Sequence, residues 1–454
     1  MKILLTVHQF FPEHSSGTEV LTRSVARNLL ARGHDVRVFT GMPTSKALSP
    51  AQRVDAYEFE GLHVYRFHSS VMPMTDGITV TEQGYNNTLA DAYFAEILSC
   101  FKPDLIHCFH LHLLGSRLID MAASRRLPIT MTPTDFWSVC PMGQLLLSDG
   151  RMCTGPSAAG GNCMKHFAET WHLSSVRFAA KWVPTLAVDA VVRLAQAHLV
   201  PVYSYRDRMD AVSARLKTNV GRLNKLKKII SPNHLMTDIL VHNGVAKTQI
   251  LESSYGIDTT QPAHDQARRA LTSTHTLPSR PLHIGFIGTL APHKGCHVLI
   301  DAFKALPAGT AVLNIYGDLY GLPAYAEQLQ ASAGGRPDIR FCGTFPNAQI
   351  ANIMAGIDVL VVPSMWYENT PLVIYSAQAA GCPVIASDCP GISVVVDHEV
   401  NGLLFKAGNA AALCQQLSRA ATDEGLIDRL SVACKPPKST SQYVDELLEV
   451  WTTP

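Results

Sequence analysis

The sequence lacks any apolar run that approaches the roughly 18 residues a membrane-spanning helix needs. It also lacks an excess of charge of either sign, because 38 Lys and Arg residues face 37 Asp and Glu residues, which leaves a net charge of +1. This balance produces no global basic field, so nucleic acid is not expected as a partner. No tract of low complexity is present and 47% of the 454 residues are hydrophobic, which excludes a disordered or fibrous chain.

The eleven cysteines are too few and too widely spread to form a dense disulfide framework. Most lie singly in apolar runs, as buried free thiols do, but Cys140, Cys153 and Cys163 lie in one polar segment. The first residues, Met1–Val7, form a strand-length apolar run without the features of a secretory leader. We therefore expect a cytoplasmic protein with reduced thiols.

Strand-like apolar runs alternate with helical patterns along most of the chain. In the first half, strands are predicted at Lys2–Val7, Val36–Thr40, His63–Phe67, Leu105–Phe109 and Ile129–Thr132. The rhythm restarts after the polar stretch Thr259–Pro281, with strands predicted at His283–Gly288, Val312–Gly317, Ile339–Cys342, Val359–Pro363 and Val384–Ser387. Such alternation is typical of parallel strands joined by crossover helices. It predicts an α/β protein with two Rossmann-like, doubly wound domains, residues 1–255 and 256–430, that face a central cleft.

The first predicted domain contains an unusual insert at about residues 165–228, whose last part is strongly basic. Arg206–Lys228 contains eight basic and two acidic residues, with apolar residues interleaved at helical spacing. A basic amphipathic helix is therefore predicted there. Its polar face is either simply solvated or docks on an anionic membrane surface or a lipid-linked acceptor, which would place the protein at the inner face of the cytoplasmic membrane.

Three loops carry residues suited to a sugar or phosphate ligand. Gly17 precedes a predicted helix whose free N–H groups could hold an anion. Lys294 provides a compact positive charge beyond the end of one predicted strand. Glu368, beyond the end of another, could accept hydrogen bonds from sugar hydroxyls. Each has a structural alternative: a tight turn fits Gly17 equally well, whereas the surroundings of Lys294 and Glu368 favour ligand contact over a surface lysine and a surface carboxylate. No G-x-G-x-x-G motif supports a nicotinamide cofactor.

Together these loops resemble the retaining glycosyltransferases of the GT-B fold, specifically glycosyltransferase family 4. The resemblance is strongest from His283 to Phe405, where IGFIGTLAPHKGCHVLIDAF, IDVLVVPSMWYENTPLVIYSAQAAGCPVIASD and NGLLF follow the family pattern in order and spacing. In the first half, PDLIHCFHLHLLG and TPTDFWSVCPMGQLL resemble a subgroup often found in surface-polysaccharide assembly. The C-terminal SQYVDELLEVW resembles the last helix of this fold, so a helix over residues 431–454 is expected to cross back to the first domain.

The resemblance implies a hexosyl- or related transferase that binds a nucleotide-diphosphate sugar mainly through its second domain and a glycan or lipid-linked acceptor mainly through its first. Lys294 would neutralise the departing diphosphate, Glu368 and His110 would contact the donor sugar, and the anomeric configuration would be retained. No metal or other cofactor is expected in catalysis. Further donor-binding residues would be Gly17, Thr289, Asn369, Thr370, Pro371, Leu372 and Ser376, and the acceptor side would include His112 and Asp135.

Several positions depart from the family pattern. Ser376 stands where a glutamate usually grips the nucleotide ribose, and Thr289 stands where an arginine commonly clamps phosphate. Phe109 replaces a histidine found in many relatives, which leaves His110 and His112 as candidates that also fit a structural role. Two alternatives stay open: a catalytically weak relative that acts as a binding or scaffolding partner, and a GT-B epimerase or hydrolase of nucleotide sugars.

The clustered cysteines raise a separate question. Cys140, Cys153, Cys163 and His166 offer three thiolates and an imidazole, which is an acceptable tetrahedral set for zinc. Only Cys163 and His166 are closely spaced, however. Three interpretations stay open: a structural zinc, unligated thiols, and a redox or disulfide role. A closed zinc site would order a loop near the acceptor rather than take part in the chemistry.

Overall fold

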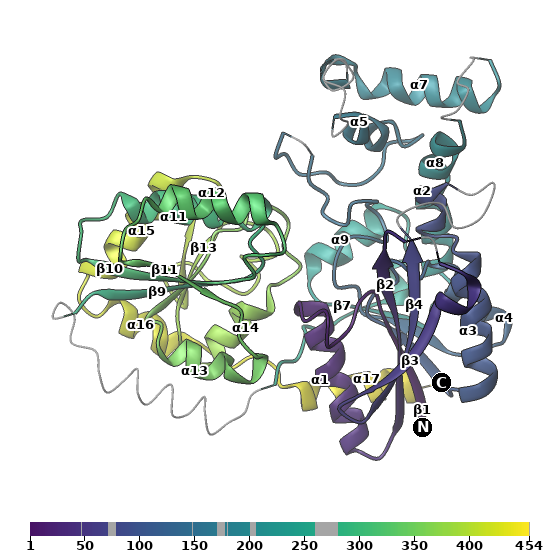
Figure 1. Ribbon diagram of the computed structural model, residues 1–454, viewed down its shortest axis with the longest axis horizontal. Coiled ribbons are helices and arrows are strands. Elements are labelled where there is room, and N and C mark those ends of the chain that lie inside the picture. The colour runs from purple at the N-terminus through teal and green to yellow at the C-terminus, as the bar shows by residue number, and fades with distance from the viewer. Residues whose placement is uncertain are drawn as a thin grey trace. The chain divides into compact units, whose positions relative to one another are not determined.

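The computed structural model describes residues 1–46, 48–70, 79–147, 149–169, 178, 180–199, 206–258 and 280–453. Contacts within the chain divide it into two units (Figure 1). Unit 1 comprises Met1–Ser254 and Val444–Pro454, and unit 2 comprises Tyr255–Tyr443. Most of the predicted polar stretch Thr259–Pro281 and parts of the predicted insert lie outside the described residues.

Unit 1 is built on an eight-stranded sheet with the strand order β3-β4-β2-β1-β5-β6-β7-β8. The strands are β1 (Lys2–Val7), β2 (Asp35–Thr44), β3 (Val54–Phe59), β4 (Leu62–Ser70), β5 (Leu105–Cys108), β6 (Ile129–Met131), β7 (Lys228–Ser231) and β8 (Ile250–Glu252). Neighbouring strands are parallel, except that β3 and β4 form an antiparallel hairpin at the sheet edge. The central strands are buried almost throughout, which explains their continuous apolar runs.

The strand β3 was not predicted from the sequence. Its signal is the turn at Glu60 and Gly61, where both residues have positive φ values of 50° and 79°. Two consecutive residues with positive φ are typical of the tight turn that joins antiparallel strands. The Glu-Gly pair therefore marks a hairpin at the edge of an otherwise parallel sheet.

Helices cover both faces of this sheet, with α1 and α3 on opposite sides of the strands (Figure 1). The helices of unit 1 are α1 (Gly17–Ala31), α2 (Val80–Gln83), α3 (Thr88–Phe101), α4 (Arg117–Ser124), α5 (Gly161–Glu169), α7 (Thr185–Gln196), α8 (Arg206–Leu223) and α9 (His234–His242). Short 3-10 turns are formed by Pro50–Gln52 and Lys247–Gln249. This arrangement is the doubly wound one that the alternating pattern predicts.

Unit 2 has a six-stranded, fully parallel sheet with the order β11-β10-β9-β12-β13-β14. Its strands are β9 (Leu282–Ile287), β10 (Ala311–Tyr316), β11 (Ile339–Gly343), β12 (Val359–Val362), β13 (Val384–Ser387) and β14 (Gly402–Phe405). Its helices are α11 (Cys296–Lys304), α12 (Pro323–Ala333), α13 (Ile350–Ala355), α14 (Leu372–Ala379), α15 (Ala410–Thr422) and α16 (Leu426–Ala433), with 3-10 turns at Pro292–Lys294 and Asn347–Gln349. Two separate apolar clusters fill the space between the sheet and the helices on its two faces. This strand order is that of the Rossmann fold.

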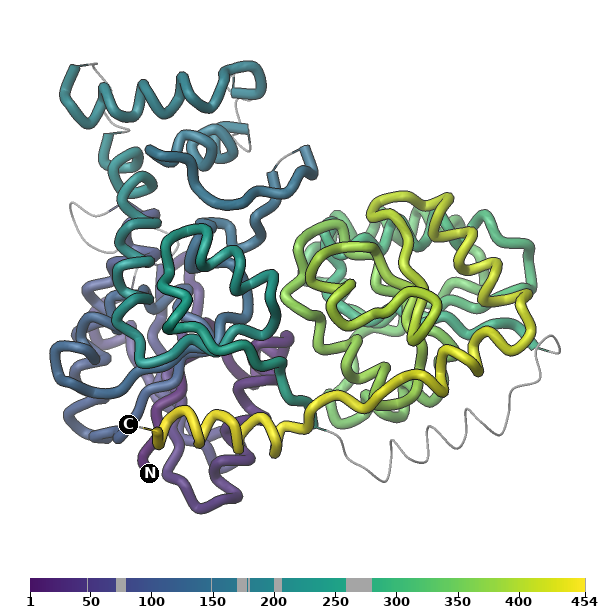
Figure 2. The backbone as a smooth tube through the Cα atoms, turned by 180° about the vertical axis from the view of Figure 1, so that it is seen from behind, coloured from purple at the N-terminus to yellow at the C-terminus, as the bar shows by residue number. Residues whose placement is uncertain are grey.

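The last helix, α17 (Thr440–Thr452), links the two units. It starts in unit 2, and from Val444 onward it belongs to unit 1, where Figure 2 shows its end. The indole Nε1 of Trp451 donates a hydrogen bond to Thr130 Oγ1 (3.0 Å) in the sheet of unit 1. The helix predicted over residues 431–454 therefore begins only at Thr440, because α16 occupies the residues up to Ala433.

Candidate active site

The carboxyl ends of β9 and β12 bring Lys294 and Glu368 together in unit 2. The two strands are neighbours, and from them the chain continues to opposite sides of the sheet, to β10 and to β13. Ligands of doubly wound sheets bind beyond the strand ends at this switch point. Lys294 ends the 3-10 turn after β9, and Glu368 lies in the loop after β12. Lys294 Nζ lies 2.7 Å from Glu368 Oε1, so two of the three residues predicted to be catalytic, which include His110, form one ion pair.

Two glycines permit this close approach of the loops. Gly295 has φ +72°, and a Cβ at this position would lie 1.9 Å from the carbonyl oxygen of Pro363. A Cβ on Gly391 would lie 1.4 Å from the carbonyl oxygen of Glu368. Contacts as short as these exclude any side chain. Glycine at these two positions therefore allows the backbone segments around Lys294 and Glu368 to pack closely.

Glu368 is a buried carboxylate that its neighbours keep ionised. Its Oε1 accepts hydrogen bonds from Lys294 Nζ (2.7 Å), Ser364 Oγ (2.7 Å) and Trp366 Nε1 (2.9 Å). Burial alone would raise the pKa of Glu368, but the Lys294 cation and these hydrogen bonds hold it below its ordinary value. The Lys294 side chain is 25% exposed and that of Glu368 is 6% exposed, so the cation is the more accessible member of the pair.

Two aromatic rings border the ion pair, and the sequence analysis assigned neither of them a role. Lys294 Nζ lies 5.2 Å from the centroid of the Trp366 ring, within the range of a cation–π interaction. The His293 ring lies 5.0 Å from the same indole. Burial, assisted by the Lys294 charge, lowers the pKa of His293 to about 4, so this imidazole is neutral at neutral pH. His293 directly precedes Lys294 and Trp366 lies two residues before Glu368, and this closeness in sequence was the available signal.

The predicted phosphate-binding segment follows Glu368 directly. Thr370 has φ +57°, which is uncommon for a β-branched residue, and such strain is typical of functional loops. The preceding Asn369 donates from Nδ2 to the hydroxyl of Tyr255 (2.9 Å). Pro371 precedes α14 and provides no side-chain cap, so the first amides of the helix, from Leu372 onward, have no side-chain acceptor. Unpaired N–H groups at a helix start can bind an anion.

The two residues that depart from the family pattern lie within α14 and just beyond the end of β9. Ser376 Oγ donates to the carbonyl oxygen of Leu372 (3.2 Å) within α14. Thr289 is exposed just beyond the end of β9, where its carbonyl oxygen accepts from the Ala291 amide (2.9 Å). Neither side chain is aimed into a polar network of the site in the way that Glu368 is.

A histidine cluster occupies the corresponding switch point of unit 1, beyond the carboxyl ends of β1 and β5. His8 follows β1, and His110 and His112 follow β5. The ring centroids of His8 and His110 are 4.3 Å apart. The backbone N–H of His112 donates to His110 Nδ1 (3.0 Å), and His110 Nε2 lies 2.9 Å from Asp135 Oδ1. Because Nδ1 accepts a hydrogen bond, the Nε2 atom carries the proton and faces Asp135.

The charges in this cluster follow from burial and from these contacts. Burial would raise the pKa of Asp135, but His110 and the amide of Trp137, which donates to Oδ1 (2.8 Å), hold it below its ordinary value. Burial lowers the pKa of His112 to about 4 and that of His8 well below its usual range. At neutral pH, an ionised Asp135 therefore faces His110, while His8 and His112 are neutral. The structure thus brings together His110, His112 and Asp135, all of which the sequence analysis had selected.

His8 and Glu19 are site candidates that the sequence analysis missed. Glu19 is 1% exposed, and its Oε1 lies 3.4 Å from His8 Nε2. Burial raises the pKa of Glu19 to about 7. The signals were local: His8 directly follows the first strand, and Ser16-x-x-Glu19 has the spacing of a capping box. Gly17 is the first residue of α1, where Ser16 makes no side-chain cap bond.

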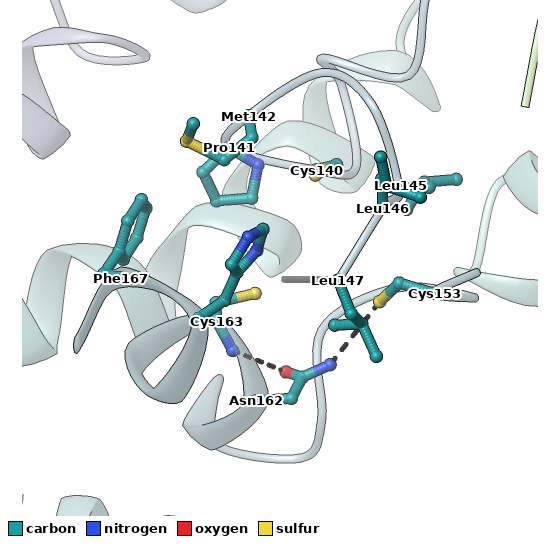
Figure 3. A pocket seen from close by; sticks show the side chains of 11 residues that line it. Cys140, Pro141, Met142, Leu145, Leu146, Leu147, Cys153, Asn162, Cys163 and Phe167 are labelled. Atoms are coloured by element: carbon teal, nitrogen blue, oxygen red, sulfur yellow. Dashed lines mark hydrogen bonds between the residues drawn. The ribbon is translucent and has the colours of Figure 1, made fainter. Parts of the chain in front are cut away.

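The predicted zinc ligands Cys140, Cys153, Cys163 and His166 all line one pocket in unit 1 (Figure 3). Among the described residues, however, no group of three or more His, Cys, Asp or Glu side chains is arranged to hold a metal ion. Burial raises the pKa of Cys163 to about 12, and it also raises that of Cys153, so both are protonated thiols as they stand. The four side chains line the same pocket but are not arranged as ligands of a metal ion, and the zinc site stays a prediction.

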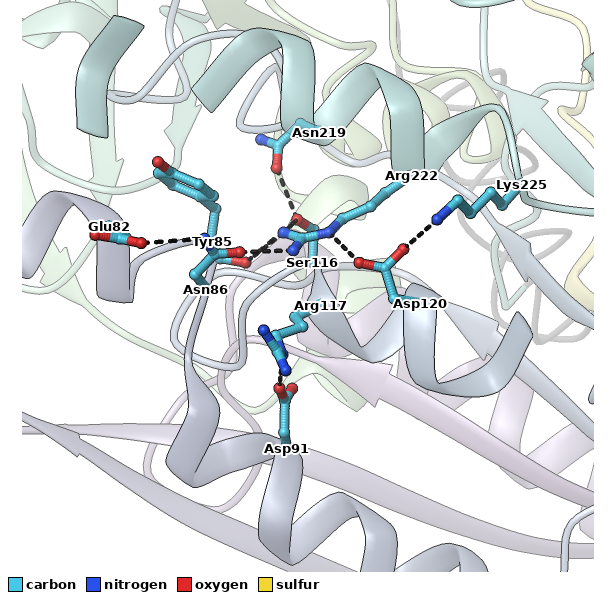
Figure 4. A network of polar contacts seen from close by, with 10 residues as sticks. All are labelled: Glu82, Tyr85, Asn86, Asp91, Ser116, Arg117, Asp120, Asn219, Arg222 and Lys225. Carbon is cyan, nitrogen blue, oxygen red and sulfur yellow. Dashed lines mark hydrogen bonds and ion pairs between the residues drawn. The ribbon is translucent and has the colours of Figure 1, made fainter. Parts of the chain in front are cut away.

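The basic helix predicted within Arg206–Lys228 is present as α8, but two of its arginines, Arg215 and Arg222, are buried. On α8, Arg222 contacts Asp120 Oδ2 (2.8 Å), the Tyr85 carbonyl (2.8 Å) and Asn86 Oδ1 (2.6 Å), as Figure 4 shows. Six of the eight basic residues are bonded to acceptors within unit 1, namely Arg206, Arg215, Arg222, Lys225, Lys227 and Lys228. These contacts join separate segments of unit 1, and the membrane contact expected for this stretch stays a prediction. None of the helices in the described parts of the chain is both long and apolar enough to cross a membrane.

Comparison with known proteins agrees with this geometry. The profile of Glycosyltransferase Family 4 matches residues 15–151, and that of Glycosyl transferases group 1 matches residues 281–423. The phosphatidyl-myo-inositol mannosyltransferase of Mycobacterium leprae is 35% identical over 146 residues, which is 31% of this chain and 37% of that protein. The D-inositol 3-phosphate glycosyltransferase of Salinispora arenicola is 30% identical over 188 residues, 38% of this chain and 42% of that protein. The matched parts thus span about two fifths of these relatives' length.

Solved structures extend the similarity of fold to the whole chain. HepE of Anabaena, crystallised with UDP and glucose, aligns over 99% of both chains with a TM-score of 0.60 and 17% identity. The sucrose-phosphate synthase of Thermosynechococcus elongatus aligns over 99% of this chain and 96% of its own, with a TM-score of 0.59 and 19% identity. Two doubly wound units, matched one after the other by two glycosyltransferase profiles, identify this chain as a member of the GT-B glycosyltransferases, with a family 4 domain followed by a group 1 domain.

Proposed function

We propose that this protein transfers a hexose or related sugar from a nucleotide-diphosphate sugar to a glycan or lipid-linked acceptor in the biosynthesis of a polysaccharide or glycoconjugate. The observation that carries the proposal is the Lys294–Glu368 ion pair at the switch point of unit 2. A nucleotide-sugar donor is further supported by HepE of Anabaena, which was crystallised with UDP-glucose. Unit 2 is proposed to bind the donor and unit 1 the acceptor.

The ion pair suggests how the leaving group is stabilised. As the bond between the donor sugar and the diphosphate breaks, negative charge grows on the phosphate oxygens, and a positioned cation lowers the energy of that state. Lys294 is proposed to supply this charge, together with the free amides at the start of α14. Ser364 and Trp366, which both donate to Glu368 Oε1, would keep these hydrogen bonds if the ammonium turned to phosphate. The carboxylate would stay ionised and accept hydrogen bonds from hydroxyls of the donor sugar.

In this scheme the protein supplies the positive charge itself, so transfer is proposed to need no divalent cation. Retention of the anomeric configuration is proposed from the resemblance to retaining members of family 4. His110, with its Nε2 proton held beside Asp135, is proposed to contact the donor sugar, and His112 and Asp135 to lie on the acceptor side. Proton NMR of the product's anomeric signal would test retention.

A catalytically weak relative with a scaffolding role is the second candidate. Two observations favour it: the Ser376 hydroxyl is engaged within α14, and Thr289 offers an exposed hydroxyl where relatives place a phosphate-clamping arginine. This alternative predicts weak or absent nucleotide binding. A nucleotide-sugar epimerase or hydrolase would instead consume donor without any acceptor.

The deciding experiment combines binding with turnover. Calorimetric titration and thermal shift with UDP, GDP and their common sugars should identify one nucleotide family that stabilises the protein, since a ligand that binds only the folded state raises its melting temperature. The same titration with Lys294→Ala should show weaker binding, whereas Lys304→Ala, an exposed lysine at the end of α11, should bind as the wild type does. Binding of no nucleotide would favour the scaffolding role, and donor loss without acceptor would favour hydrolysis or epimerisation.

A further inference from the structure

The segment around α7 in unit 1 concentrates exposed apolar side chains. Seven of the sixteen large apolar side chains exposed among the described residues lie between Phe178 and Leu199. We name these seven the apolar patch: Phe178 (70% exposed), Trp182 (72%), Val183 (38%), Leu186 (82%), Val191 (45%), Leu194 (41%) and Leu199 (70%). Isolated apolar residues on a surface are ordinary, but a cluster of this kind on one segment marks an interaction site.

The buried face of α7 shows which side of this helix is exposed. Asp189 Oδ1 accepts hydrogen bonds from Ser157 Oγ (2.8 Å) and from the backbone N–H groups of Ala159 (3.1 Å) and Gly161 (2.8 Å). A Cβ on Gly161 would lie 2.6 Å from the same oxygen, so α5 begins directly against α7. The α7 side chains buried together with Asp189 are those of Val192 and Ala195. The three patch residues on α7, Leu186, Val191 and Leu194, are therefore on the outer side of a helix that is anchored through its inner side. Figure 1 shows α7 beyond α5 as seen from the sheet of unit 1.

The charges around the apolar patch are of one sign. Lys181 and Arg193 are exposed, whereas the acidic residue of the described segment between Phe178 and Leu199, Asp189, is buried. Phe178 and Trp182 lie with their ring centroids 6.3 Å apart at the start of the segment. Exposed aromatic and aliphatic side chains flanked by cations are the composition of helices that lie in the interface of an anionic bilayer.

We propose that the apolar patch docks unit 1 on the surface of an anionic lipid bilayer. The patch is carried on a protruding helix and not in a groove, which suits insertion between lipid headgroups better than it suits capture of a partner helix. Lys181 and Arg193 contribute by attracting anionic headgroups. This inference concerns a different segment from Arg206–Lys228, and it concerns where the protein works, so it stands independently of the proposed chemistry.

Vesicle flotation of the full-length protein tests the proposal. The wild type should float with vesicles of phosphatidylcholine and phosphatidylglycerol, and less with phosphatidylcholine alone. Leu186→Ser/Leu194→Ser should bind about a hundredfold more weakly, since each leucine kept out of lipid lowers partitioning roughly tenfold. The matched control is Tyr320→Ser/Val432→Ser, which changes two comparably exposed side chains of unit 2 (86% and 75%) and should float as the wild type does.

Two further measurements test the contribution of the positive charges and the insertion of Trp182 into the bilayer. Lys181→Gln/Arg193→Gln should weaken binding to the anionic vesicles by about fivefold per charge and leave binding to phosphatidylcholine unchanged. The fluorescence of the wild type should shift to shorter wavelength with anionic vesicles, and Trp182→Phe should abolish the shift. All these side chains are exposed or partly exposed, so the melting temperature should not change.

Three outcomes would overturn the proposal. The wild type could fail to float with anionic vesicles, or the leucine double variant could float as well as the wild type. A wild-type dimer that the leucine double variant converts to a monomer, without vesicle binding by either, would assign the apolar patch to contact between two copies of the chain.

Discussion

At the residue scale, Glu368 shows how a buried carboxylate is kept charged. Three donors converge on its Oε1 atom, and only one of them, Lys294, carries a full charge. Ser364 and Trp366 would therefore still hold the carboxylate if Lys294 bound a ligand, as proposed above.

Replacing Lys294 by alanine should therefore affect the rate more than the fold. We expect Lys294→Ala to lower kcat by about 10²–10³-fold, the usual cost of losing one preorganised charge stabiliser. The melting temperature should fall only modestly because Ser364 and Trp366 still satisfy Glu368. Steady-state kinetics of donor turnover, compared with Lys304→Ala, would measure the effect. Unchanged turnover in Lys294→Ala would contradict the assignment of the leaving-group site.

Glu19 should make the stability of unit 1 depend on pH. Its pKa rises from 4.5 to about 7 on burial, so between these values the folded state holds a proton that the unfolded state has lost. This contribution is complete below about pH 4.5 and is lost as the pH rises through 7. Glu19→Gln cannot ionise, so it should be more stable than the wild type at pH 8, by up to about 3 kcal/mol.

Urea unfolding of the two proteins at pH 5 and at pH 8 would check this. The difference in free energy of unfolding between Glu19→Gln and the wild type should grow toward pH 8. An equal difference at both pH values would show that Glu19 is charged in the folded protein throughout this range.

At the element scale, Gly295 is one of the two glycines that let the loops of the candidate site pack closely. Gly295→Ala places a methyl group against the Pro363 carbonyl and imposes a positive φ on alanine. Gly309→Ala is the matched control, because Gly309 has φ +80° but no atom within 4 Å of its Cβ position. The control should lose about 1–2 kcal/mol from the backbone alone, and Gly295→Ala should lose about 1–3 kcal/mol more from the clash.

Thermal unfolding and donor turnover would separate these effects. Gly295→Ala should also lose activity, because the clash moves Lys294 away from Glu368, whereas Gly309→Ala should keep it. Equal stability and activity of the two variants would mean that the loop adapts to a side chain at Gly295.

The cysteine loop is the second element with a testable prediction. If Cys140, Cys153, Cys163 and His166 close around zinc, protein purified without chelator should contain about one zinc ion per chain. Cys163→Ser should lose the metal and lower the melting temperature, while Cys100→Ser, at an exposed thiol, should retain both. Elemental analysis gives the metal content. If the protein contains no zinc and its intact mass does not change with reductant, the cysteines are unligated thiols. If reduction adds the mass of two hydrogens, they form a disulfide.

At the scale of the whole molecule, α17 ties the C-terminal end of unit 2 to the sheet of unit 1. Trp451 is buried, its ring lies 5.3 Å from that of His107, and its Nε1 bonds to Thr130 Oγ1. Trp451→Ala should lower the free energy of unfolding of unit 1 by about 3–5 kcal/mol. Trp182→Ala, at an exposed tryptophan of the same unit, should change it by less than about 0.5 kcal/mol.

Hydrogen exchange followed by mass spectrometry resolves the two units. Trp451→Ala should speed exchange in β1, β5 and β6 while leaving β9 and β12 unchanged. Faster exchange throughout both units would show that they unfold as one.

Prediction from sequence succeeded where the information was local in the chain. The strands β1 and β13 have the bounds that their apolar runs predicted, and Lys294 and Glu368 lie in the loops where strand ends were expected. Parallel topology follows from the strand–helix alternation, and it places the ends of neighbouring strands at one edge of the sheet. These steps need only periodicity and chain order.

Prediction failed where partners are far apart in sequence. The basic stretch Arg206–Lys228 looked free, but Arg222 reaches the Tyr85 carbonyl and Asp120 across more than a hundred residues of chain. The burial of Glu19 beside His8, and the gathering of three cysteines around one pocket, likewise depend on how loops pack. The exposure of the apolar patch also depends on tertiary packing. Periodicity shows that α7 has apolar residues, but it does not show which of them another element covers.

The sequence by itself thus determined the α/β alternation, the order of the strands along the chain and the chemical types of the residues at their ends, since these are properties of neighbouring residues. The tertiary structure alone decided which charges are paired, which carboxylates are buried and which apolar face is left bare. Those properties depend on distances between segments that folding brings together, and no local pattern encodes them.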